Sequence, residues 1–235
     1  MKATLARTPM ELRGIRRRLL GWWQVNGRHL PWRETDEPYR VLLAEILLQQ
    51  TRFSKVIPAY NRLLELAPDP AALAIASIGD LEALVQPLGL VSRARRLKRL
   101  GVEITGRYNG RVPTTEHQLV RLPGVGEYAA RAVRCFSLNR PEPLVDRMTA
   151  RFYWRLLGIA PTDRPARDKR LWAAVAALQG RRPRNFHLAV IDFTSMICRA
   201  RQPQCKICPL AKDCTFSPVN ANNTEAPIYR ASPHT

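Results

Sequence analysis

Four of the five cysteines lie in one short segment near the end of the sequence. They are Cys198, Cys205, Cys208 and Cys214, spaced C-x6-C-x2-C-x5-C. Four thiolates that converge from one loop can hold a tetrahedral zinc ion or an iron–sulfur cluster. Zinc ribbons more often use two separated C-x2-C pairs, whereas loop 198–214 has one close pair flanked by two single cysteines. The spacing therefore favours a cluster over zinc.

A second segment that could form a binding site is LPGVG, residues 122–126, which precedes an alanine-rich amphipathic run. Gly124 and Gly126 lack the Cβ atom that would block a close approach of the backbone, and the helix that follows begins with unpaired amides. Backbone amides at a helix N-terminus bind phosphate without reading sequence. The hairpin predicts a phosphate site made by Gly124, Val125 and Gly126, although a purely structural turn could also use such glycines.

Two carboxylates stand out by their surroundings. Glu45 is the only polar side chain between Val41 and Leu48, so its pKa is expected to rise and to suit a general acid, unless it occupies the solvated side of its helix. Asp146 precedes a helix and has Thr149 three residues later. This pattern favours an ordinary N-cap; the alternative is a carboxylate kept ionised to stabilise a cation or to act as a nucleophile.

The overall charge indicates the partner. The 235 residues include 38 Lys and Arg against 19 Asp and Glu, giving a net charge of +19, and 46% of the residues are hydrophobic. A folded domain this basic most often binds a polyanion, so nucleic acid is the first candidate, ahead of an anionic membrane or an unengaged basic surface. Segment 92–100, SRARRLKRL, is one candidate phosphate contact.

No apolar run reaches the length needed to span a bilayer, and the first residues lack a signal-peptide core. We therefore expect a soluble, monomeric protein in the cytoplasm, associated with the nucleoid if it is prokaryotic, with no membrane partner.

The apolar residues recur with helical periodicity, which predicts an all-α protein of many short helices. The expected helices are 9–26, 38–51, 53–66, 70–77, 79–86, 90–107, 115–120, 127–138, 145–157, 167–179 and 184–198. Residues 217–235 are polar and lack periodicity, which predicts a disordered tail.

From about Leu20 to Phe216, these features in this order resemble the helix-hairpin-helix base-excision glycosylases of the endonuclease III superfamily. The resemblance implies two helical domains with a DNA cleft between them. Residues 30–143 would form a bundle carrying the hairpin, and residues 1–29 with 144–216 would form a domain carrying the cluster loop. The partner would be double-stranded DNA with a mismatched or damaged base, which is flipped out of the duplex.

The resemblance also implies roles for single residues. Asp146 falls on the catalytic aspartate, which revises its reading as a simple cap, and the four cysteines fall on the ligands of a [4Fe–4S] cluster. Tyr128 occupies the position where bifunctional members carry a lysine that forms a Schiff base. Tyrosine cannot form that imine, so the chain is expected to remove a base without cleaving the strand.

Two subfamilies compete for the substrate. Segment 28–51 resembles MutY-type adenine glycosylases, and the positions that match their adenine pocket are Arg28, Leu30, Trp32, Arg33, Glu45 and Gln50. Segment 186–198 looks more like thymine mismatch glycosylases, with Leu188 where MutY-type enzymes place a glutamate. Leu90 and Val91 replace the MutY tyrosine pair, Met148 departs from both patterns, and we expect no C-terminal domain that reads oxidised guanine.

The favoured substrate is thymine or uracil opposite guanine. The alternatives are adenine opposite guanine or 8-oxoguanine, another damaged base, and a catalytically silent DNA-binding protein.

Overall fold

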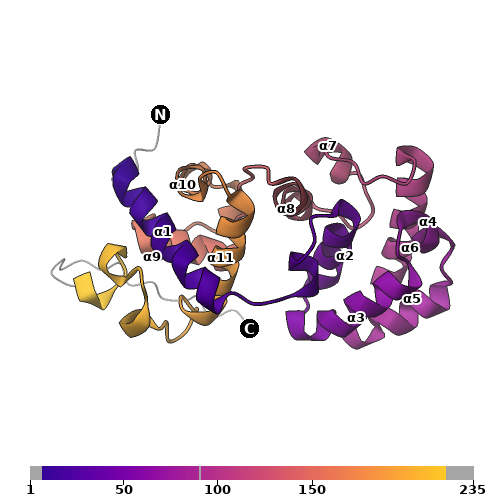
Figure 1. Ribbon diagram of the computed structural model, residues 1–235, viewed down its shortest axis with the longest axis horizontal. Coiled ribbons are helices and arrows are strands. Elements are labelled where there is room, and N and C mark those ends of the chain that lie inside the picture. The colour runs from indigo at the N-terminus through magenta and orange to yellow at the C-terminus, as the bar shows by residue number, and fades with distance from the viewer. Residues whose placement is uncertain (1–6, 90, 221–235) are drawn as a thin grey trace. The chain divides into compact units, whose positions relative to one another are not determined.

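The computed structural model describes residues 7–89 and 91–220. Within these residues the chain is all-α, as predicted, and no strand is present. Contacts divide it into two compact units: His29–Glu142 form one, and the segment up to Arg28 joins the chain from Pro143 onward in the other. Figure 1 labels the helices of both units.

The unit that contains the chain's N-terminal helix is built around four helices. They are α1 Pro9–Asn26, α9 Arg147–Leu157, α10 Lys169–Gln179 and α11 Pro183–Met196, with short 3-10 turns η3 Pro165–Arg167, η4 Cys205–Ile207, η5 Ala211–Asp213 and η6 Pro218–Asn220. Helices α1 and α9 both pack against α11. Their apolar faces form one core that includes Ile15, Phe152 and Phe193. Three cluster-loop cysteines, Cys198, Cys208 and Cys214, pack against its edge.

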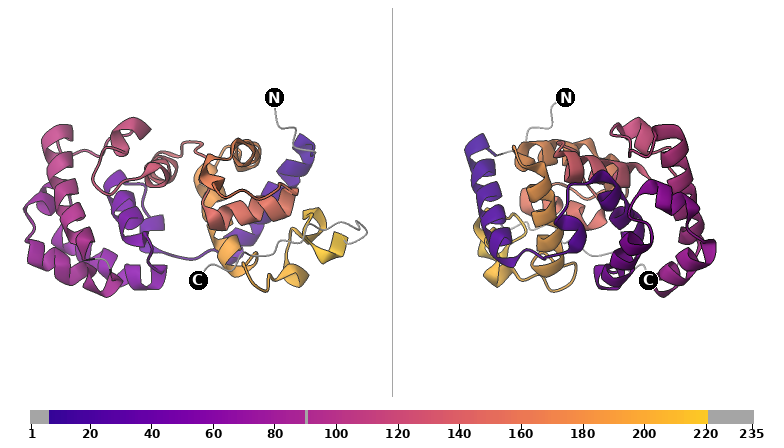
Figure 2. Two further views of the ribbon diagram at one scale, coloured as in Figure 1. Left: turned by 180° about the vertical axis from the view of Figure 1, so that it is seen from behind. Right: turned by 45° about the vertical axis from the view of Figure 1, so that its right-hand side comes forward.

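The second unit contains seven helices. They are α2 Pro38–Leu48, α3 Phe53–Leu66, α4 Pro70–Ile75, α5 Ile78–Val85, α6 Ser92–Tyr108, α7 Glu116–Leu119 and α8 Glu127–Leu138, with 3-10 turns η1 Pro31–Arg33 and η2 Gln86–Leu88. Helix α6 packs against α4 and α5, and α2 packs against α8. The views in Figure 2 also show α2 beside α8. This pairing brings the Glu45 helix to the hairpin.

Most predicted helix ends agree with the structure to within two residues, and the exception is informative. Helix α2 was expected to reach residue 51 but ends at Leu48, because Gln49 leaves the helical conformation with ψ 115° and Gln50 is left-handed with φ 55°. Helix α9 begins at Arg147 rather than 145, since Asp146 is its cap.

The first four residues of the predicted tail, 217–220, are structured. Ser217 is buried, and η6 occupies residues 218–220. Residues 221–235, and Leu90, lie outside the described range. Among the helices described, none combines the length and apolar character needed to cross a membrane.

Candidate functional site

The glycine hairpin connects α7 to α8 through a tight turn. The Leu122 amide donates to Leu119 O, and the Val125 amide donates to Leu122 O at 3.1 Å. Gly124 has φ +81°, a conformation that favours glycine. An ion pair between Arg131 Nε and Glu116 Oε1, 2.8 Å apart, ties α8 to α7. The turn is therefore fixed by its own hydrogen bonds and by its two helices.

These contacts correct one of the three predicted phosphate-binding residues. The amide of Val125 is used inside the turn, and its side chain is buried. Gly126 is exposed and is the N-cap of α8, with no side-chain cap. The first turn of α8 is therefore the better place for phosphate, because amides at a helix N-terminus attract anions.

The two hairpin glycines differ in how well the protein would tolerate a side chain at each position. At Gly126 the backbone has φ −90°, and a Cβ would meet no atom within 4 Å. The protein itself would therefore accept alanine at Gly126 but would be strained by alanine at Gly124. Glycine at position 126 would therefore serve the close approach of a binding partner to the backbone.

This difference predicts distinct effects on stability and on DNA binding for alanine at Gly126 and at Gly124. Gly126→Ala should lower stability by roughly 0.5–1 kcal/mol, because alanine is a poorer N-cap than glycine, and should also weaken binding to duplex DNA of any sequence. Gly124→Ala should lower stability by about 1 kcal/mol because its backbone is left-handed. Thermal unfolding and DNA titrations measure both effects. Unchanged DNA affinity in Gly126→Ala would remove the hairpin from the DNA contact.

The other predicted residues of this unit lie on or beside α2 and α8. Glu45 is half-buried on α2 among buried apolar neighbours, and Tyr128 is half-buried in the first turn of α8. Gln50 is exposed just beyond α2. Leu30 and Trp32 are buried in the unit's core, where Trp32 packs edge-on against Tyr60 with ring centroids 5.4 Å apart. Leu30 and Trp32 therefore support the fold beneath α2.

Sequence reasoning missed Arg93. It belongs to the basic segment 92–100 that was predicted to contact phosphate, but it is 2% exposed. Burial, and then the charge of Arg96, lower its pKa. Its sequence signal is its position: Arg93, Leu97 and Leu100 share the apolar face of α6, and all three are buried. A charge at such a position indicates a buried partner, here the end of α2.

In the other unit, Asp146 is the N-cap of α9, as its sequence pattern predicted. The cap uses one of its two carboxylate oxygens. Oδ1 accepts from the Thr149 amide at 2.7 Å, and the Thr149 hydroxyl lies 2.9 Å from the same oxygen. Thr149 Oγ1 accepts in turn from the Asp146 amide at 2.9 Å, completing a capping box. Among the residues described, Oδ2 has no hydrogen-bond partner. The cap thus holds the carboxylate and leaves Oδ2 available.

Arg28 has a structural partner in the same unit. Its Nε lies 2.6 Å from Asp192 Oδ1, and its amide donates to Asp192 Oδ2 at 3.0 Å. Trp23 Nε1 donates to the same carboxylate at 3.1 Å, which is fully buried on α11. A buried carboxylate needs such partners. Arg28 is thus held against α11, and Leu188, on the same helix, is buried.

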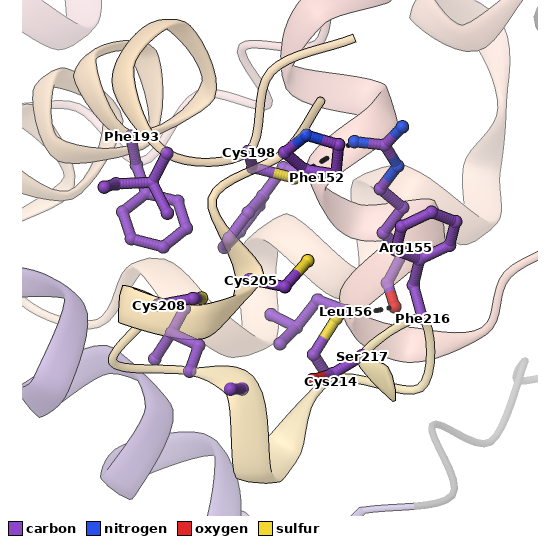
Figure 3. Close-up of a pocket in the computed structure, with 14 residues that line it drawn as sticks. Phe152, Arg155, Leu156, Phe193, Cys198, Cys205, Cys208, Cys214, Phe216 and Ser217 are labelled. Atoms are coloured by element: carbon purple, nitrogen blue, oxygen red, sulfur yellow. Dashed lines mark hydrogen bonds between the residues drawn. The ribbon is translucent and has the colours of Figure 1, made fainter. Parts of the chain in front are cut away.

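The four clustered cysteines line one pocket together with apolar residues of α9 and α11 (Figure 3). The pocket holds about 400 Å³ of space, including the part open to solvent. No three His, Cys, Asp or Glu side chains among the described residues are close enough to hold a single metal ion. A zinc ion binds sulfur at about 2.3 Å, which brings its ligands close together. The four thiols of the loop share one pocket.

Two arginines of α9 hold the cluster loop. Arg155 donates to Arg199 O at 2.7 Å and to Ala200 O at 3.1 Å, and its Nη1 lies 3.7 Å from Cys198 Sγ. Arg151 donates to Cys198 O through two nitrogens, at 3.0 and 3.1 Å. The guanidinium of Arg155 also stacks on Phe216, 4.4 Å from the ring centroid. The loop is therefore fixed mainly through its backbone carbonyls.

Burial keeps three of the thiols protonated when no metal is bound. Desolvation raises the pKa of Cys208 and of Cys214 to about 11, and it raises the pKa of Cys205 as well. The neighbouring cysteines add to each rise, because two thiolates repel one another. Metal binding at this pocket must therefore release protons.

Several known DNA glycosylases are similar to this chain. A thymine/uracil-DNA glycosylase from Pyrobaculum aerophilum is 39% identical over 205 residues, covering 84% of this chain and 89% of the relative. An adenine DNA glycosylase from Mycobacterium tuberculosis is 36% identical over 195 residues, covering 82% of this chain and 64% of the relative. The solved structure of a thermostable thymine-DNA glycosylase superposes with a TM-score of 0.81 at 28% identity, covering 87% of this chain and 95% of that one.

The family model described as HhH-GPD superfamily base excision DNA repair protein matches residues 43–176. This range includes Glu45, the hairpin and Asp146. The chain therefore belongs to the HhH-GPD superfamily of base excision DNA repair proteins.

Proposed function

We propose that this protein is a monofunctional DNA glycosylase that removes thymine or uracil mispaired with guanine and leaves an abasic site. The observation that carries the proposal is its 39% identity to a thymine/uracil-DNA glycosylase over most of both chains. Leu188 supports it, because a leucine offers no hydrogen bond by which to select adenine. Tyr128 supports the absence of strand cleavage, since it has no amine.

In this proposal the chemistry depends on Asp146. As the bond between base and sugar breaks, positive charge develops on the sugar, and a carboxylate fixed beforehand stabilises that charge without reorganising. The capping box fixes Oδ1 and leaves Oδ2 without a partner among the described residues. Asp146 would thus act through Oδ2 as an electrostatic stabiliser, held in position by the Thr149 amide.

The other proposed roles belong to the hairpin unit. Glu45 would position water or polarise the departing pyrimidine; for an adenine substrate it would instead protonate the base. Gln50 is exposed and would contact DNA at the flipped nucleotide. The first turn of α8 would grip a phosphate through its amides.

We further propose that Cys198, Cys205, Cys208 and Cys214 hold a [4Fe–4S] cluster. The donor set fits, because thiolates are the ligands of such clusters, and all four cysteines line one pocket. The cluster would supply structural support for a loop rich in Lys and Arg. Catalysis is assigned to Asp146 instead.

The cluster proposal predicts the metal content of the purified protein. Protein prepared without oxygen should be brown and contain iron and acid-labile sulfide in equal amounts, with little zinc. Cys208→Ser should lose most of the iron, whereas Cys135→Ser, on α8, should retain it. Stoichiometric zinc without sulfide in colourless protein would contradict the proposal.

Removal of adenine opposite guanine or 8-oxoguanine is the second candidate. It is favoured by 36% identity to an adenine DNA glycosylase and by the presence of Glu45 and Gln50. The test is a panel of matched duplexes containing T·G, U·G, A·G or A opposite 8-oxoguanine, with kcat/KM measured for each. The proposal expects the highest values for T·G and U·G. Highest values for the adenine duplexes would reverse the assignment, and binding without excision of any base would favour a silent DNA-binding protein.

A further inference from the structure

A short turn, residues 49–51, follows helix α2 and carries Gln50 in an unusual conformation. Gln50 has φ 55°, which is unfavourable for a residue other than glycine. The turn is closed by the Thr51 amide, which donates to Leu48 O at 3.1 Å. Such a conformation persists only where its surroundings hold it.

One support comes from the hairpin. The side-chain amide of Gln49 donates from Nε2 to Gly124 O at 2.8 Å. Gly124 is the left-handed residue of the hairpin turn. The backbone of the proposed phosphate grip is therefore bonded directly to the residue that precedes Gln50.

The other support comes from helix α6. Arg93 Nη1 donates to Leu47 O at 3.0 Å, and Nη2 donates to Gln49 O at 2.7 Å. Both nitrogens also lie 3.3 Å from Thr51 Oγ1. The guanidinium thus satisfies carbonyls at the C-terminal end of α2, where a cation is favoured by the helix dipole. The planar fork of arginine matches this set, whereas the single ammonium of lysine does not.

Arg96, on the same helix, lies near the hairpin, since a Cβ built on Gly124 would be 3.5 Å from Arg96 Cδ. Helix α6 thus supports turn 49–51 through Arg93. A displacement of the hairpin would be transmitted to Gln50 through Gln49.

We infer that Gln49 and Arg93 are positioning residues that couple phosphate binding at the hairpin to the placement of Gln50 at the target nucleotide. This inference rests on the proposed function, since it assumes that the hairpin and Gln50 both contact DNA. Neither residue is assigned contact with the reacting atoms. Their loss should therefore slow base excision more than it weakens DNA binding.

The first test is Gln49→Met, which keeps the length of the side chain and removes the donor. Single-turnover excision at saturating enzyme should fall about tenfold, as for the loss of one well-placed hydrogen bond. The Kd for undamaged duplex should stay within about twofold of wild type, because phosphate contacts dominate that affinity. Gln86→Met, at an exposed glutamine of η2, should change neither quantity.

The second test uses Arg93→Lys and Arg93→Met. Excision rates should fall in the order wild type, Arg93→Lys, Arg93→Met, and amide hydrogen exchange should quicken in residues 47–51. Leu81→Ala, in the core of α5, serves as a control that loses stability without loosening that turn. Hydrogen exchange and the effect of Gln49→Met can be read even if Arg93→Met does not fold.

Three results would overturn the inference: wild-type excision by Gln49→Met, equal losses of rate and affinity in that variant, or unchanged exchange of residues 47–51 in Arg93→Lys. Failure of the wild-type protein to excise any base would instead overturn the proposed function. In that case the exchange measurement would still show whether Arg93 holds the turn.

Discussion

Asp146→Asn should lower the single-turnover rate of base excision by about 10²-fold or more, a loss typical of a removed electrostatic stabiliser. Asparagine caps helices as well as aspartate does, so Oδ1 can still accept from the Thr149 amide. The substitution therefore removes the negative charge and keeps the cap. Rate measurements at saturating enzyme, together with thermal unfolding, would record a large kinetic loss beside an almost unchanged Tm.

Asp146→Ala provides the matched control. It removes both charge and cap, so it should lose about 1 kcal/mol of stability in addition to activity. An Asp146→Asn variant that excised at the wild-type rate would show that the residue is only a cap, which was the first interpretation of its sequence pattern.

Tyr128→Lys should acquire strand cleavage that needs no alkali. A lysine amine can attack the sugar carbon exposed by base loss and form a Schiff base, which tyrosine cannot. The resemblance to bifunctional members implies that residue 128 meets the sugar, and its half-buried position favours a neutral amine. Borohydride should trap a covalent complex between the variant and DNA, visible as a shifted band on a denaturing gel.

Tyr128→Met is the control for this variant, because it has similar bulk but no amine. It should yield neither a trapped complex nor nicked DNA. If Tyr128→Lys still removed the base yet gave no trapped complex, residue 128 would not meet the sugar, and the proposed basis for monofunctional chemistry would be lost.

The helical framework could be predicted from local signals. Four helices, α1, α2, α4 and α11, begin with a proline, where its fixed φ is favourable and its missing amide costs nothing. Apolar periodicity predicted which faces are buried, and Cys135 lies fully buried on α8 as a small apolar residue. These features depend on residues close in sequence, so they can be read without a structure.

The supports of the proposed site depend on distant residues and were not predicted. Nothing local indicates that Gln50 would be left-handed, because its conformation is held by Arg93 and Gln49. The Val125 amide was assigned to phosphate, since a hairpin motif does not show which of its amides the turn itself consumes. Arg28 was assigned to a base pocket, and its pairing with Asp192 spans 164 positions of the sequence.

The most direct measurement of the central claim is a time course on a duplex with one T·G mismatch, each sample analysed with and without hot alkali. We expect that, in samples treated with alkali, cleavage at the thymine increases over the time course. In samples without alkali it should be nearly absent. Equal cleavage with and without alkali would contradict monofunctional chemistry. No cleavage under either condition, with the duplex still bound, would contradict removal of mispaired thymine altogether.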